Sequence, residues 1–97
     1  MVDYTIKINN GSFEQNFELR SDERYFQWEL YLNGMKSYYT IKCIGDTDDV
    51  YYDLYKKDKP IKTFEFENGG LGVYSNLLEV LTYIIKISYH HLSRTLV

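Results

Sequence analysis

The feature that most constrains the fold is a pair of Asn-Gly dipeptides, each lying between two segments in which apolar and polar residues alternate. A two-residue turn of type I′ needs positive φ at both central positions, which asparagine and glycine tolerate best. Asn10-Gly11 and Asn33-Gly34 therefore predict two β-hairpins. Because side chains of a strand point alternately to its two faces, the alternation also predicts that one face of each hairpin is buried.

The same alternation continues over most of the chain. Strands are predicted over about residues 3–9, 12–20, 25–33, 35–44, 49–56 and 61–67, joined by short turns. Short connections make sequential neighbours pair, so the third, fourth and fifth strands are expected to lie side by side. Pro60 has no N–H to donate, which predicts that the sixth strand lies at an edge of the sheet.

After Gly72 the apolar period changes to that of a helix, predicted over about residues 75–92 with Ser75 as its N-cap. Its polar residues share one narrow arc, made of Glu79, Thr82, Lys86 and His90. The remaining apolar arc is wider than one sheet normally covers. Either the sheet curls around the helix, or Ile85, Ile87 and Tyr89 form an interface with a second copy in a homodimer.

Together these segments predict an α+β fold: a six-stranded antiparallel β-meander with a curled sheet and one C-terminal α-helix packed across one face. The chain has 97 residues, without a linker or an internal repeat, and is predicted to be a single domain, residues 1–97.

Composition and charge narrow the functional classes. The net charge of −3 argues against direct nucleic-acid binding and against a membrane surface, both of which favour basic proteins. The N-terminal residues predict no secretory signal, and the longest apolar run, interrupted by Glu79 and Lys86, is too short to span a bilayer. Cys43 is the single cysteine, which is typical of a reducing compartment. The protein is predicted to be cytoplasmic, in a bacterial host.

The most unusual feature of the composition is its eleven tyrosines. Five of them fall at outward positions of the third, fourth and fifth strands: Tyr25, Tyr31, Tyr38, Tyr51 and Tyr55. Exposed aromatic area of this extent indicates a partner. The alternative is that cross-strand tyrosine pairs only stabilise an open sheet.

An acidic cluster lies in the turn before the fifth strand and continues into it: Asp46, Asp48, Asp49 and Asp53. Such carboxylates can imitate a line of phosphates toward the basic residues of a nuclease. The alternative is an ordinary solvated turn, because aspartate is a common turn residue whose side chain caps local backbone donors. We take these four aspartates and the five tyrosines as the candidate partner-binding residues.

Catalytic and cofactor motifs are not found in the sequence. The acidic turn lacks the calcium-loop pattern, and GGLGVYSN lacks the third glycine and the lysine of phosphate-binding loops. His90 and His91 are neighbours, which on a helix point about 100° apart and cannot ligate one metal together. Cys43 is expected in the core, without a cationic neighbour to activate it. We therefore predict no enzyme activity, no metal and no cofactor.

In its size, acidity and lack of a catalytic motif the chain is similar to the small inhibitors that phages and mobile elements use against bacterial defence nucleases, anti-CRISPR proteins among them. No single motif carries this similarity. It implies a non-enzymatic inhibitor whose partner is a nucleic-acid-processing protein with a basic surface. Two alternatives remain open: an immunity protein that neutralises a toxin, and a small-ligand protein that stacks nucleotide bases on its tyrosines.

Overall fold

The computed structural model, which describes residues 1–11, 13–22 and 27–95, has one open antiparallel sheet and one long helix. Spatial order follows sequence order throughout the sheet, so β6 is an edge strand and β3, β4 and β5 are neighbours, as predicted. The elements are β1 (Val2–Asn10), β2 (Phe13–Asp22), β3 (Gln27–Leu32), β4 (Met35–Asp46), β5 (Asp49–Lys56), β6 (Lys59–Phe66), the 3-10 helix η1 (Glu67–Gly69) and α1 (Val73–Thr95). The predicted α+β class, with a six-stranded meander and a C-terminal helix, is confirmed.

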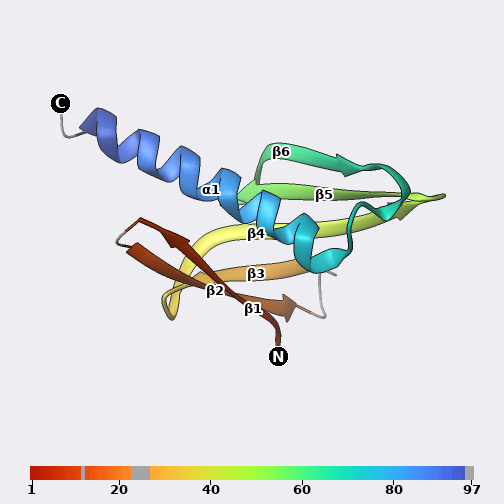
Figure 1. Ribbon diagram of the computed structural model, residues 1–97, viewed down its shortest axis with the longest axis horizontal. Helices are drawn as coiled ribbons and strands as arrows, with labels where there is room; N and C mark the ends of the chain where they lie inside the picture. Colours follow the sequence, from red (N-terminus) through yellow and green to blue (C-terminus); the bar gives the residue numbers. More distant parts are fainter. Residues whose placement is uncertain (12, 23–26, 96–97) are drawn as a thin grey trace.

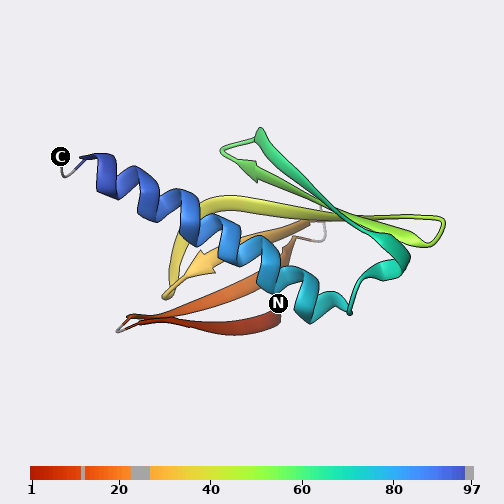
Figure 2. The same cartoon turned by 45° about the horizontal axis from the view of Figure 1, so that its top comes forward.

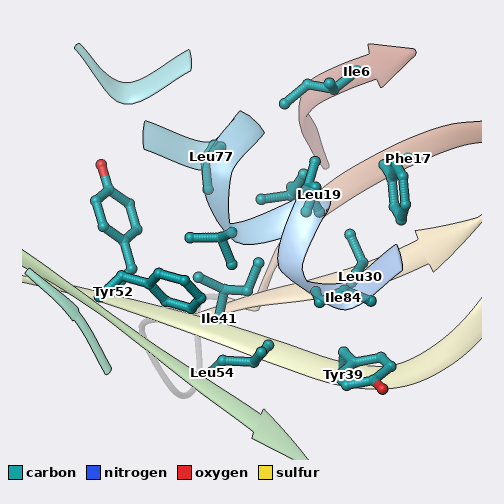
Figure 3. Close-up of a cluster of buried hydrophobic side chains, with 13 residues drawn as sticks. Ile6, Phe17, Leu19, Leu30, Tyr39, Ile41, Tyr52, Leu54, Leu77 and Ile84 are labelled. Carbon is teal, nitrogen blue, oxygen red and sulfur yellow. The ribbon is translucent and has the colours of Figure 1, made fainter. Parts of the chain in front are cut away.

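The helix α1 crosses one face of the sheet diagonally, with the β1–β2 hairpin and the β5–β6 hairpin on its two sides (Figures 1 and 2). Alternate residues of the strands and one side of α1 form the core (Figure 3). The buried apolar residues are Ile6, Phe17, Leu19, Leu30, Tyr39, Ile41, Tyr52, Leu54, Phe64, Leu77, Val80, Leu81 and Ile84. The opposite face of the sheet, which we call the outer face, is covered by neither of the described helices.

The turns β1–β2, β3–β4 and β5–β6 can each be compared with the type I′ turn, which needs positive φ at both central residues. Asn33 and Gly34 have φ values of 50° and 81°, as predicted for the β3–β4 turn. Lys57 and Asp58 adopt φ values of 50° and 65° in the β5–β6 turn, although neither is glycine. The β1–β2 turn was predicted one residue too early, because Asn10 still pairs with Phe13 and so belongs to the strand ladder.

β4 contains a bulge that breaks the regular ladder with β3. The register passes from Glu29–Thr40 to Tyr31–Lys36, and Tyr38 within this segment has a φ of 67°. The Ser37 hydroxyl donates to the Leu30 carbonyl (2.6 Å) and accepts from the Tyr39 N–H (3.2 Å). These bonds compensate for the ladder contacts that the bulge removes.

The connection from η1 to α1 is fixed by one buried amide. Asn76 donates through its side chain to the Gly69 carbonyl at 3.0 Å and to the Tyr52 hydroxyl at 3.4 Å. Gly70 has φ 66° and ψ −142°, and a Cβ there would collide with the Asn76 side chain. The helix begins at Val73, so the prediction of Ser75 as N-cap was wrong; Gly72 takes that place, because its carbonyl accepts the Asn76 N–H (3.0 Å).

Candidate protein-binding surface

The predicted tyrosine face does not form one continuous patch. Tyr31 is half-buried under the Arg20 guanidinium, whose carbon lies 3.8 Å from the ring centroid. Tyr51 is half-buried and donates a hydrogen bond from its hydroxyl to Glu65 Oε1 at 3.3 Å. Their partners on β4 are Lys36 and Ile44, which are separated by about 25 Å of strand. The two tyrosines therefore lie near opposite ends of the sheet.

The other predicted tyrosines are dispersed as well. Tyr38 is 56% exposed, beside the bulge of β4. Tyr55 is half-buried on the outer face of β5, and Tyr25 lies outside the described residues. Among the described positions the structure thus gives single tyrosines set among charged side chains, because the strand twist and the bulge separate residues that alternate evenly in the sequence.

The predicted aspartates do gather, at the far end of the β4–β5 hairpin. Asp46 ends β4, Asp48 lies in the turn and Asp49 begins β5. Pairing of β5 with β6 adds Glu65 opposite Tyr51, and Glu67 follows Phe66, the partner of Val50. We call this group of five carboxylates, made of Asp46, Asp48, Asp49, Glu65 and Glu67, the acidic tip.

Asp53 does not belong to the acidic tip. It lies four residues further along β5, half-buried, opposite Lys42, and accepts a hydrogen bond from the Thr63 hydroxyl at 2.8 Å. Its carboxylate is therefore already engaged within the sheet. Glu65 and Glu67 were missed from the sequence, where the only available signal was the hairpin register that places β6 beside β5.

The acidic tip is held by local hydrogen bonds and, in the part of the chain that the structure describes, has no basic ion-pair partner. Asp49 Oδ1 accepts from the Asn68 N–H (3.1 Å), which ties the hairpin to η1, and Asp46 Oδ1 accepts from the Thr47 hydroxyl (3.4 Å). Within the described residues no ion pair includes any of the five carboxylates; the pairs found are Lys7–Glu14, Arg20–Glu18 and Lys36–Glu29.

The titration of Tyr51 reports the resulting negative potential. The charge of Glu65 is the largest cause that raises the pKa of Tyr51 above its ordinary value, and Asp49 and Asp46 add to it. A negative charge on the phenolate would be repelled by these carboxylates, so the neutral form is favoured. Over the described part of the chain no three acidic, histidine or cysteine side chains are placed to hold a metal ion.

A hollow of about 470 Å³ lies between the β4 bulge and the β5–β6 turn. Its lining includes Glu29, Lys36, Tyr38, Lys57 and Asp58. The Lys36 and Lys57 ammonium groups each lie 5.8 Å from the centroid of the Tyr38 ring. The lining holds three acidic side chains, Asp22, Glu29 and Asp58, together with the two lysines, so both signs of charge meet here, in contrast to the acidic tip.

Cys43 differs from its prediction. It shares the helix-side face with its partner Tyr52, yet it is exposed. Partial burial raises the pKa of the Cys43 thiol, and a hydrogen bond with Tyr52 lowers it by a smaller amount. The thiol therefore stays protonated at neutral pH and is not activated as a nucleophile.

The residues proposed for a homodimer lie on the C-terminal half of α1. Ile85 and Ile87 are half-buried against the core of their own chain, and the side chain of Tyr89 lies outside the described residues. In both views the last turns of α1 extend past the sheet (Figures 1 and 2).

No protein-family model matches this chain, and neither the curated proteins nor the solved structures with which it was compared gave a significant match. Among the described residues, no helix combines the length and apolar character needed to cross a membrane.

Proposed function

We propose that this chain is a non-enzymatic inhibitor that binds a protein with a basic surface, in the manner of phage or mobile-element proteins that block bacterial defence nucleases. The observation that supports it most is the acidic tip: five carboxylates without an ion-pair partner in the described structure, at one end of the molecule. Concentrated charge of one sign accelerates encounter with an oppositely charged partner.

The geometry of the tip suits a surface that normally binds a nucleic-acid backbone. Successive carboxylates on β4, the turn, β5 and β6 present several negative charges over a short distance, as phosphates do. Arginine and lysine side chains that bind phosphates bind carboxylates through the same charge-assisted hydrogen bonds. A nuclease whose basic channel received this tip would be blocked from its substrate.

The proposal is tested by association kinetics with purified bacterial defence nucleases and toxin nucleases. In Asp46→Asn/Asp48→Asn, two exposed charges of the tip are removed without a change of size. We expect the association rate with the inhibited enzyme to fall about tenfold at low salt, and the difference to shrink as salt is raised. The control, Glu14→Gln/Asp58→Asn, removes two exposed charges away from the tip and leaves the same net charge.

Equal effects of the two double variants would show that net charge, not the tip, governs binding. Failure of the native protein to bind or inhibit any enzyme of the panel would refute the inhibitor proposal. Selective neutralisation of a toxin nuclease would instead identify an immunity protein, which uses the same electrostatics.

The hollow beside Tyr38 favours a second candidate, a small-ligand protein. Its volume of about 470 Å³ lies within the range of ligand pockets, and an exposed tyrosine ring flanked by two lysines suits a nucleotide. Nucleotide at a hundred times its Kd would stabilise the protein by about 2.7 kcal/mol, seen as a rise in Tm. Tyr38→Ala should abolish that rise, and no rise with the native protein would eliminate this candidate.

A further inference from the structure

A group of exposed apolar side chains lies at the connection between η1 and α1. Leu71 is 90% exposed, Tyr74 50% and Val73 39%. We call these three residues the apolar knob. The other large exposed apolar residues in the described part of the chain occur singly along the sequence or, at residues 1 and 2, as a pair. Exposed apolar residues that cluster in this way are typical of interaction sites.

The backbone that carries the apolar knob is fixed on both sides. Before Leu71, the conformation of Gly70 is one that only glycine adopts readily, and its Cα lies against the Asn76 side chain. After Leu71, Asn76 is 2% exposed and bonds to Gly69 and Tyr52. A side chain presented on a fixed backbone loses less conformational entropy on binding than one on a loose loop.

The apolar knob lies at the same end of the molecule as the acidic tip. The Asn68 N–H donates to Asp49 of the tip. Leu71 follows Asn68 by three residues, so the Cα atoms of Asn68 and Leu71 are at most about 11 Å apart. Both ribbon views show the β6–α1 connection beside the β4–β5 hairpin, far from the C-terminal end of α1 (Figures 1 and 2).

We infer that the apolar knob is the anchor of the interface to which the acidic tip contributes the charge, with Leu71 entering an apolar pocket that basic residues surround in the partner. The class of partner rests on the proposed function; the pairing of knob and tip rests on their shared position. Interfaces gain most of their affinity from a few buried apolar anchors and much of their encounter rate from the charged rim.

The charge of the acidic tip distinguishes between three possible partners for this surface: a second copy of the chain, a lipid surface and a different protein. A second copy docking by the same end would bring two acidic tips together, and like charges across an interface disfavour it. An anionic lipid surface would be repelled by the same carboxylates. A protein surface that is apolar at its centre and basic around it satisfies both features, which commits the inference to a heterologous protein partner.

The inference can be tested without knowing the natural partner, by selecting random displayed peptides on the purified protein. We expect enriched peptides to combine large apolar residues with arginine or lysine. Leu71→Ser should increase their dissociation rates at least about tenfold, because a buried leucine anchor contributes about 1.5–3 kcal/mol. The matched control is Met35→Ser, an apolar residue that is 74% exposed next to the β3–β4 turn.

Circular dichroism and Tm should be unchanged in both variants, since neither side chain is packed in the core. Peptides that bind Leu71→Ser and native protein alike, or selections that yield no apolar and basic peptides, would overturn the inference. Asp46→Asn/Asp48→Asn separates the contributions further: it should slow peptide association and leave dissociation nearly unchanged. If the selected peptides depend on Leu71 but the native protein inhibits no enzyme of the nuclease panel, the binding surface is supported and the inhibitor function is refuted.

Discussion

At the scale of single residues, Asn76 joins the start of α1 both to the connection just before it and to the more distant strand β5. Its side-chain amide donates to the β6–α1 connection at Gly69 and to Tyr52 on β5, while it is itself part of the first turn of α1. A buried amide costs free energy unless its partners are present, so these bonds specify where the helix starts. Sequence reasoning missed this role, since an asparagine near a helix start is ordinary and its partners are set by tertiary structure.

We predict that Asn76→Ala lowers the free energy of unfolding by about 1–3 kcal/mol, because it leaves the Gly69 carbonyl without its side-chain donor and removes a partner from the buried Tyr52 hydroxyl. Urea denaturation followed by circular dichroism measures the loss. Asn9→Ala, at an exposed position of β1, serves as the control. Similar losses of unfolding free energy in the two variants would mean that the hydrogen bonds of the Asn76 amide do not stabilise the fold.

A second prediction at this scale concerns the ionisation of Tyr51. Glu65→Gln removes the largest cause that raises its pKa, so the pKa of Tyr51 should fall toward the ordinary value. Absorbance titration at alkaline pH, taken as the difference from Tyr51→Phe, isolates this group among the other tyrosines. Asp53→Asn should leave the titration in place, because Asp53 is not among the charges that act on Tyr51.

The sign of the pH dependence follows from the direction of that shift. Tyr51 binds its proton more tightly in the folded chain than in the unfolded chain. Its contribution to stability is therefore complete below the unfolded pKa near 10 and is lost as the pH rises through the higher folded pKa. A titration of Tyr51 that is unchanged in Glu65→Gln would mean that the tip carboxylates do not act on this group.

At the scale of elements, alternation and turn chemistry predicted the strands and the helix because both signals are local. β4 contains a feature, its bulge, that these local signals do not predict. Tyr38 at positive φ has no sequence signal, since tyrosine rarely adopts it. The conformation depends on the Ser37 bonds and on the Lys57 N–H, which donates to the Tyr38 carbonyl at 3.0 Å. For the site, the aspartates of the turn could be identified from the sequence. The positions of Glu65 and Glu67, and the separation of the tyrosines from one another, depend on the strand register, which the sequence does not show.

The β5–β6 turn gives a prediction for an element. Asp58 has a φ of 65°, a conformation that glycine adopts without steric cost. Asp58→Gly should therefore raise the free energy of unfolding by about 1 kcal/mol. Gly34→Ala in the β3–β4 turn, at a φ of 81°, should lower it by a similar amount. Denaturant midpoints of both variants test the pair, and equal signs for the two changes would contradict the argument.

At the scale of the whole molecule, the acidic tip is a local concentration of negative charge. The chain measures 45 × 27 × 25 Å, with the acidic tip at one end of β5 and Lys56, Lys57 and Lys59 around the other end. The net charge of −3 is small, yet the acidic tip concentrates negative charge, whereas Asp58 lies among the lysines at the other end of β5. A basic partner would therefore be oriented during approach, so that it meets the tip before any other surface.

We also predict a homodimer through the C-terminal half of α1, because Ile85 and Ile87 pack against the core and still keep part of their apolar surface exposed. Ile87→Lys should convert the dimer to a monomer in sedimentation equilibrium. Ser88→Lys, at the adjacent exposed position, should leave the mass of the dimer unchanged. A monomeric mass for the native protein at all concentrations would exclude this association.

The position of α1 after all six strands has a consequence for biosynthesis. Each strand pairs with its predecessor, so the sheet can form step by step as the nascent chain leaves the ribosome. Its apolar face, however, has no cover until Leu77, Leu81 and Ile84 have been made. During that interval the growing chain exposes Phe17 and Ile41, the kind of surface that chaperones recognise and that aggregates when synthesis stalls. A ribosome that stops before residue 73 would release a sheet whose apolar face is exposed and prone to aggregation. Rapid synthesis of the residues of α1 would shorten the time during which that face is uncovered.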